Sequence, residues 1–131
     1  PEEYIPSIKM RVWLYKEISS IRDVFSLDLF FGKIENLFGP IPLFLNNLLS
    51  LRRVKILGRG CFFLKIVINN GEAFITLDSF FWENKIDSLF SVLFGFKFNL
   101  LKGGEVVRVV LKDPFLLDLL TSTYDLVKKN I

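Results

Sequence analysis

The chain has 131 residues, of which 51% are hydrophobic and 24% are charged, and its formal net charge is +3. This composition excludes a disordered chain, and the length allows a core that needs no disulfide or metal. Histidine is absent and Cys61 is the one cysteine, which excludes cysteine proteases and Ser-His-Asp hydrolases, because both need an imidazole. We therefore expect residues 1–131 to form a single domain with no enzymatic activity, metal site or cofactor.

The first half of the chain is predicted to contain two strands and two helices. Apolar and polar residues alternate over residues 8–15 and over residues 53–56, which is the period of a half-buried strand. Between these segments, apolar residues recur at helical spacing over residues 18–25. Two prolines then interrupt the chain before a second helix, which is expected over residues 43–51.

Two hairpins are predicted from short turns, residues 70–71 (Asn-Gly) and residues 103–104 (Gly-Gly). Both turns suit a two-residue connection whose central residues have positive φ. The cross-strand pairs expected on one apolar face are Ile68 with Ala73, Ile66 with Ile75, Leu64 with Leu77, Leu100 with Val107, Phe98 with Val109 and Phe96 with Leu111. Because Lys97, Asn99 and Arg108 fall on the opposite face, the pattern indicates an antiparallel sheet that is covered on one side only.

Two further helices are predicted in the second half. Asp78 or Ser79 can cap a helix that ends at Gly95, and the last helix begins with Asp113 and Pro114, which favour a helix start. Together these elements predict an α+β fold, an antiparallel sheet of about five to six strands with helices packed mainly on one face.

Two short motifs follow the order of elements in a known family. Residues 72–78 (EAFITLD) read as a strand that leads to a capped helix, and residues 94–103 (FGFKFNLLKG) read as a strand bracketed by glycines. In this respect residues 61–111 resemble the sterol-carrier-protein-2 family, although the predicted first strand departs from that family's helical start. The resemblance implies a helix-covered sheet that encloses an apolar tunnel for a lipid or fatty acyl chain.

Fifteen phenylalanines are more than the packing of a core needs. The excess indicates either an aromatic-rich core or phenylalanines that line a cavity or a partner surface. Our first hypothesis is non-enzymatic binding of a lipid, a fatty acyl chain or another apolar small molecule in a cavity between sheet and helices. The residues expected to line this cavity are Phe81, Phe90, Phe94, Phe96 and Phe98.

Two alternatives stay open. The aromatic residues could instead form the exposed surface of a protein interaction module or homodimer. The uncharged segment 36–51 is the candidate surface, with Phe44 and Leu48 at its centre. Nucleic-acid binding ranks third and is not expected, because the net charge is modest. Its candidate residues are Arg52, Arg53, Lys55 and Arg59.

The sequence carries no recognisable targeting signal. It begins Pro1-Glu2-Glu3, without the basic and apolar regions of a signal peptide. The longest uncharged run, residues 36–51, is shorter than the roughly 20 residues of a spanning helix. Because a single thiol also suits a reducing compartment, we expect a cytoplasmic location and no transmembrane segment.

Overall fold

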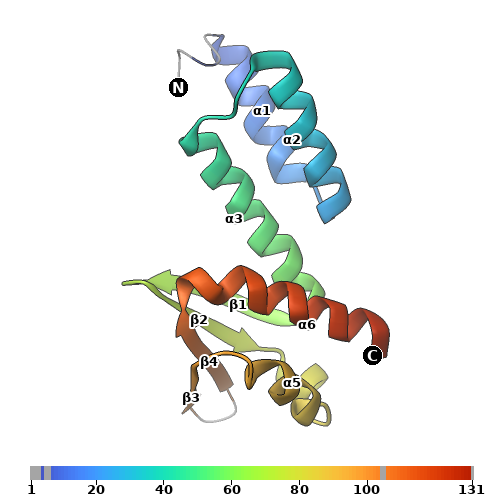
Figure 1. The fold of residues 1–131 in the computed structure, drawn as a ribbon, viewed down its shortest axis with the longest axis vertical. Helices are drawn as coiled ribbons and strands as arrows, with labels where there is room; N and C mark the ends of the chain where they lie inside the picture. The colour runs from blue at the N-terminus through green and yellow to red at the C-terminus, as the bar shows by residue number, and fades with distance from the viewer. Residues whose placement is uncertain (1–3, 5–6, 104–105, 131) are drawn as a thin grey trace. The chain divides into compact units, whose positions relative to one another are not determined.

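The computed structural model describes Tyr4, residues 7–103 and residues 106–130. The chain divides into two compact units, Pro1–Ile56 and Leu57–Ile131. The helices are α1 (Ile8–Ser20), α2 (Val24–Phe38), α3 (Leu43–Gly60), α4 (Ser79–Trp82), α5 (Ile86–Leu93) and α6 (Leu116–Asn130), and the strands are β1 (Phe63–Asn69), β2 (Glu72–Leu77), β3 (Phe98–Gly103) and β4 (Val106–Lys112) (Figure 1). The chain was predicted to form a single domain over residues 1–131, and this stays a prediction.

The first unit consists of α1, α2 and most of α3 around an aliphatic core. Its buried side chains are Leu14, Ile18, Leu27, Ile34, Leu45 and Leu49. Within each helix the two buried residues are four or seven positions apart, so each helix contributes one face to the core. Side-chain caps begin the first two helices, because Ser7 accepts a hydrogen bond from the Met10 amide and Asp23 accepts one from the Ser26 amide.

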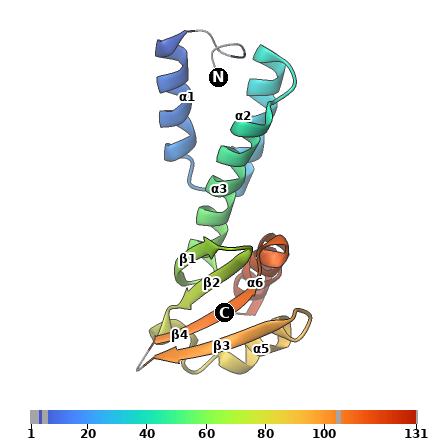
Figure 2. The same cartoon turned by 90° about the vertical axis from the view of Figure 1, so that its left-hand side faces the viewer.

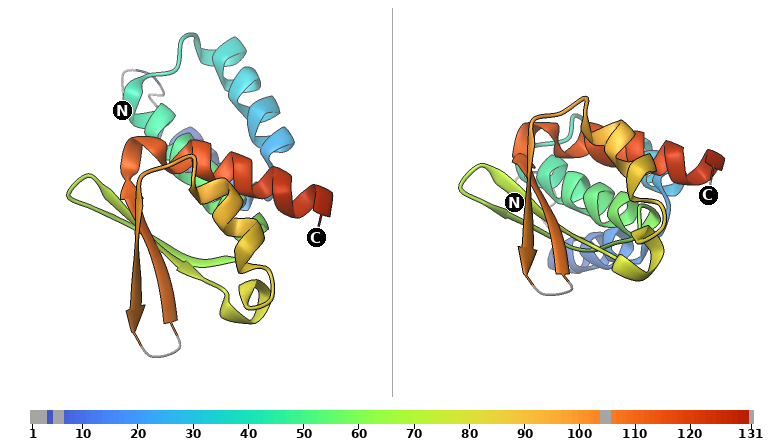
Figure 3. Two further views of the ribbon diagram at one scale, coloured as in Figure 1. Left: turned by 60° about the horizontal axis from the view of Figure 1, so that its bottom comes forward. Right: turned by 90° about the horizontal axis from the view of Figure 1, so that it is seen from below.

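The second unit is an antiparallel sheet with the strand order β1-β2-β4-β3. Helices α5 and α6 lie on one face of this sheet, which we call the inner face (Figure 2). Figure 3 shows the structure from two further directions, and in both views α5 lies beside α6. The side chains buried between sheet and helices are Ala73, Ile75, Leu77, Leu89, Leu93, Val109, Leu111, Leu116, Leu119 and Leu120. The structure is therefore α+β, as predicted, with one covered face.

The two strands predicted in the first half of the chain are wrong. Residues 8–15 lie in α1 and residues 53–56 lie in α3, so the described residues contain four strands rather than five to six. The alternating residues Ile8 and Val12 are 70% and 47% exposed. The core contact instead comes from Leu14 and Ile18, which are four residues apart and lie on one face of the helix. Alternation over one short segment therefore did not reveal the element that buries its apolar residues.

The first predicted hairpin is confirmed over most of its length. Ile66 pairs with Ile75 and Ile68 pairs with Ala73, but the ladder is irregular between Phe63 and Lys65, so that Phe63 pairs with Leu77. The predicted pair of Leu64 with Leu77 is wrong. The irregularity lets the large Phe63 ring reach the core at 7% exposure, while Leu64 is 68% exposed.

The second predicted hairpin forms with a different register. Leu100 pairs with Val109 and Phe98 pairs with Leu111, which is two residues away from the predicted pairing. Gly103 pairs with Val106, so the strands connect through residues 104–105, which lie outside the described part of the chain. Since side chains alternate with a period of two, a two-residue shift leaves every side chain on its predicted face. Phe96, which was expected to pair with Leu111, precedes β3.

The predicted helices are confirmed in part. The helix expected over residues 43–51 belongs to α3, but the helix expected over residues 18–25 is interrupted between α1 and α2. The helix expected from Asp78 to Gly95 is split into α4 and α5, and Asp113 begins a short 3-10 turn, Asp113–Phe115, before α6. No helix in the described residues is long and apolar enough to cross a bilayer.

We expect Gly60→Ala to destabilise the second unit. A Cβ on Gly60 would lie 2.5 Å from Cε1 of Tyr124, whereas a Cβ on Gly103 would meet nothing within 4 Å. Overpacking of this kind costs about 1–3 kcal/mol in the free energy of unfolding, which urea denaturation measures. Gly103→Ala should change it by less than about 0.5 kcal/mol. In a Tyr124→Ala background the cost of Gly60→Ala should vanish, and an unchanged cost there would contradict the steric explanation.

Candidate functional site

The second unit has a stacked pair of phenylalanines, Phe62 and Phe81, and an exposed phenylalanine, Phe80, next to Phe81 in the chain; we call these three residues the aromatic cluster. The rings of Phe62 and Phe81 are stacked, with centroids 3.8 Å apart and planes 5° from parallel. Phe62 is 41% exposed, and Phe80, the neighbour of Phe81 in α4, is 95% exposed. A phenylalanine whose side chain is almost fully exposed is a candidate residue of a contact surface.

The backbone that positions the stacked rings is strained at Phe62. Phe62 has φ 56°, in the left-handed region that bulky residues rarely adopt. Its carbonyl accepts a hydrogen bond from the Asp78 amide at 3.0 Å. In turn the Asp78 side chain accepts from the Phe81 amide at 3.3 Å. These bonds connect the segment before β1 to α4, so that the two stacked rings are positioned by two separate parts of the chain.

Trp82 and Lys85 complete the support of the aromatic cluster. The Trp82 indole is buried at 1% exposure and donates from Nε1 to the Cys61 carbonyl at 3.0 Å. Its ring meets the Phe81 ring edge-on, with centroids 5.0 Å apart. The Lys85 ammonium lies 4.8 Å from the Phe81 ring centroid, within the range of a cation–π contact. The stacked pair is therefore held in one position, with a cation beside the Phe81 ring.

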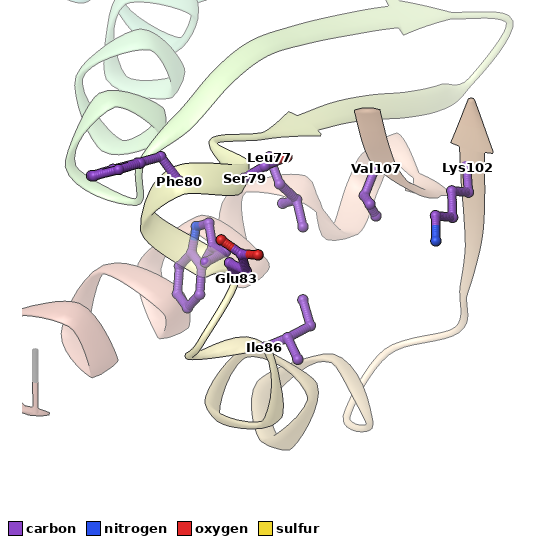
Figure 4. A pocket seen from close by; sticks show the side chains of 8 residues that line it. Leu77, Ser79, Phe80, Glu83, Ile86, Lys102 and Val107 are labelled. Atoms are coloured by element: carbon purple, nitrogen blue, oxygen red, sulfur yellow. The ribbon is translucent and has the colours of Figure 1, made fainter. Parts of the chain in front are cut away.

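A pocket of about 700 Å³ lies next to α4 and α5 (Figure 4). It is lined by Leu77, Ser79, Phe80, Trp82, Glu83, Ile86, Lys102 and Val107. In Figure 4 Ile86 and Val107 project into the space from α5 and β4, and Glu83 and Lys102 lie on opposite sides of it. The pocket can therefore take an apolar group between two side chains of opposite charge.

The structure places the five phenylalanines that were predicted to line a cavity in different surroundings. Phe90 stacks with Phe94 and with Phe98, at centroid distances of 6.1 and 6.4 Å. Phe94 is 77% exposed, Phe96 is half-buried before β3, and Phe81 belongs to the aromatic cluster. The pocket described above is lined by none of the five. Their role in binding stays a prediction.

The residues predicted for contact in the first unit are largely engaged within that unit. Phe44 and Leu48 are half-buried against its core. Arg53 forms an ion pair with Asp28, and Arg52 donates to the Ile21 carbonyl at 2.9 Å. Two of the four basic residues thus contact other parts of the first unit, while Lys55 and Arg59 are exposed. A contact role for Phe44 and Leu48 stays a prediction.

Sequence reasoning missed Phe62, Phe80 and Trp82. The run Phe80-Phe81-Trp82 is a visible aromatic signal, but no pattern indicates which of the three rings is buried. The positive φ of Phe62 has no sequence signal either, because glycine or asparagine is the usual residue there.

The sole cysteine is a packing residue. Cys61 is 0% exposed and its Sγ lies 3.3 Å from the Leu120 carbonyl. Burial raises the pKa of the Cys61 thiol to about 12, so the thiolate that reacts as a nucleophile is suppressed.

We expect Phe62→Gly to be more stable than Phe62→Ala. Both variants lose the stack on Phe81, but only glycine adopts positive φ without strain. The difference in the free energy of unfolding should be about 1 kcal/mol in favour of glycine, measured by urea denaturation. Equal stabilities would show that the backbone at this position is unstrained.

We expect the Cys61 thiol to react far more slowly in the folded chain than in the unfolded chain. The raised pKa lowers the thiolate fraction at pH 8 on the order of 1,000-fold. Because the unfolded chain loses this proton first, the free energy of unfolding should also fall as the pH rises from about 9 toward 12. Labelling with iodoacetamide at pH 8, with and without denaturant and with Cys61→Ser as the blank, measures the reaction. Equal labelling rates would contradict the burial.

Comparisons with known proteins identify the family. Residues 1–86 match the sequence model of the TRCF domain. The solved structure described as the C-terminal domain of transcription-repair coupling factor is similar, with a TM-score of 0.82, 18% sequence identity, and coverage of 98% of this chain and 85% of that chain. No curated protein matches. At 18% identity the structural likeness shows the fold, and the match over residues 1–86 shows the family.

The resemblance to the sterol-carrier-protein-2 family is therefore wrong, and with it the hypothesis that the chain binds a lipid or another apolar small molecule. Residues 72–78 and 94–103 are short apolar segments of a strand–helix–strand arrangement, which recurs in many folds and carries no ligand chemistry. The family match also includes the part of the chain before residue 61 that the resemblance left unexplained. The chain belongs to the TRCF domain family.

Proposed function

We propose that this chain is a non-catalytic protein-binding module that acts in DNA repair linked to transcription. Membership of the TRCF domain family supports the process, because the similar solved structure is part of a transcription-repair coupling factor. The absence of histidine from the sequence supports a role without acid–base catalysis near neutral pH. The described residues also contain no group of three or more side chains suited to hold a metal ion.

The exposed aromatic cluster is the observation that carries the proposal. Phe80 is 95% exposed, and it is the chain neighbour of Phe81, which stacks on Phe62. Aromatic side chains dominate the energetics of protein interfaces, because a rigid ring buries a large area with little loss of side-chain entropy. A rigid, solvent-facing aromatic group therefore suits contact with another protein.

The experiment that tests this function is competition in cells. An excess of the isolated chain should occupy the partner and slow the removal of DNA lesions from transcribed strands, while removal from non-transcribed strands stays unchanged. An excess of the Phe80→Ser chain should not compete. Because Phe80 is 95% exposed, the substitution should change the free energy of unfolding by less than about 0.5 kcal/mol. Strand-specific lesion counts after irradiation measure the effect.

Leu43→Ser is the matched control, since Leu43 is 74% exposed but lies in the first unit. This variant should compete as well as the unchanged chain. If the Phe80→Ser chain competed as strongly as the unchanged chain, the aromatic cluster would not be the surface that binds the partner. A lack of competition by the unchanged chain would remove the protein-binding function itself.

A further inference from the structure

Strand β3 is an open edge of the sheet. Its six residues pair with β4 in an unbroken register, and within the described residues β3 pairs with no other strand. Figure 2 shows it as the outermost strand on its side. The opposite edge strand, β1, carries an irregularity between Phe63 and Lys65. Bulges disrupt an edge against further pairing, and a regular edge strand lacks this protection.

The side chains of β3 favour contact. Leu100 and Leu101 are 45% and 46% exposed. They lie on opposite faces of the sheet, because they are adjacent in an extended strand. A new strand beside β3 would cover apolar surface on both faces and would also satisfy backbone groups that β3 leaves unpaired on its outer side.

The charged residues around this edge indicate which kind of partner would bind there. The described residues of β3 and β4 include Lys102, Arg108 and Lys112 and no acidic residue, and the exposed Lys97 directly precedes β3. Glu72 of β2 pairs with Lys112 and offsets its charge. The other three cations are on the side of the sheet nearest the open edge, because β3 and β4 are the last two strands in the order. Glu83 lies across the pocket from Lys102, but Lys97 and Arg108 add to the positive charge of this edge, so complementarity favours an acidic segment.

The pocket lies on the inner face of this same edge. Lys102 of β3 and Val107 of β4 form part of its lining and are cross-strand partners. A strand added beside β3 would run about 4.8 Å away, and every second side chain of it would point to the inner face. One apolar side chain on that face would be placed beside the pocket, opposite Ile86. In this mode of recognition, backbone bonds supply affinity and a pocket supplies specificity.

We propose that β3 binds an extended acidic segment of a partner protein by strand addition, with an apolar side chain of that segment in the pocket. The proposal rests on the protein-binding function above and adds a contact surface at β3, whose pocket shares Phe80 with the aromatic cluster. It commits to a partner in which acidic and apolar residues alternate, since Arg108 lies on the outer face of this edge while the pocket, with Lys102 at its border, lies on the inner face. A second copy of the chain is disfavoured, because pairing two β3 strands would bring cations together.

The test uses the whole chain and two synthetic peptides. One probe is an eight-residue peptide of alternating glutamate and valine with blocked ends, and the other has lysine in place of glutamate. We expect the glutamate peptide to shift the backbone amide NMR signals of residues 98–103 and the methyl signals of Ile86 and Val107. The lysine peptide should bind at least about ten-fold more weakly.

A charge-reversed variant, Lys97→Glu with Lys102→Glu, should lower affinity for the glutamate peptide about ten-fold and raise affinity for the lysine peptide. The matched control, Lys9→Glu with Lys16→Glu, changes the net charge equally on exposed positions of α1 in the first unit and should bind as the unchanged chain does. Amide spectra of both variants check that the sheet is intact.

Four results would overturn the proposal: no shifts on β3 at millimolar peptide, shifts confined to other surfaces, equal binding of the two peptides, or concentration-dependent shifts on β3 without peptide, which would mean that a second copy occupies the edge. The competition experiment in cells separates this proposal from the function it rests on. If the chain still competes through Phe80 while the charge preference at β3 is absent, only strand addition is wrong.

Discussion

The indole of Trp82 holds together the part of the second unit on which both candidate surfaces depend. It is buried at 1% exposure, bonds to the Cys61 carbonyl and contacts the rings of Phe63 and Phe81. Loss of a buried aromatic residue of this size typically costs about 3–5 kcal/mol. Through these contacts the end of α3, the start of β1 and the short helix α4 adopt one arrangement, although a four-residue helix has little stability of its own. The stacked phenylalanines and one wall of the pocket follow from that arrangement.

The sequence predicted the sheet of the second unit better than the helices of the first, for a physical reason. An Asn-Gly turn constrains the register of the strands on either side, so Ile66 and Ile75 were paired correctly. Residues 8–15 offered only an alternation of apolar and polar side chains, and a helix accommodated it because its buried contacts come from Leu14 and Ile18. The bulge beside Leu64 could not be predicted, because it depends on Phe63 reaching a core formed by distant residues.

The candidate site was predicted less well than the fold. The excess of phenylalanine did not distinguish an aromatic core, a lined cavity and an exposed surface, and the lipid-binding hypothesis that it motivated was wrong. That distinction depends on which ring of the run Phe80-Phe81-Trp82 turns inward, and this is decided by the bond from the Trp82 indole to a carbonyl twenty-one residues earlier. Family membership then corrected the function, since apolar strand and helix motifs are shared by folds with unrelated roles.

The two edges of the sheet differ, and this asymmetry limits how the unit can grow. The ladder of β1 is irregular beside Leu64, which makes that edge less suited to a further strand, whereas the pairing of β3 is regular throughout. A sheet with two available sides can continue from molecule to molecule into a fibre. A sheet with one available side accepts a single additional chain and stops there. The irregularity that accompanies the burial of the Phe63 ring therefore also makes β1 a less regular edge than β3.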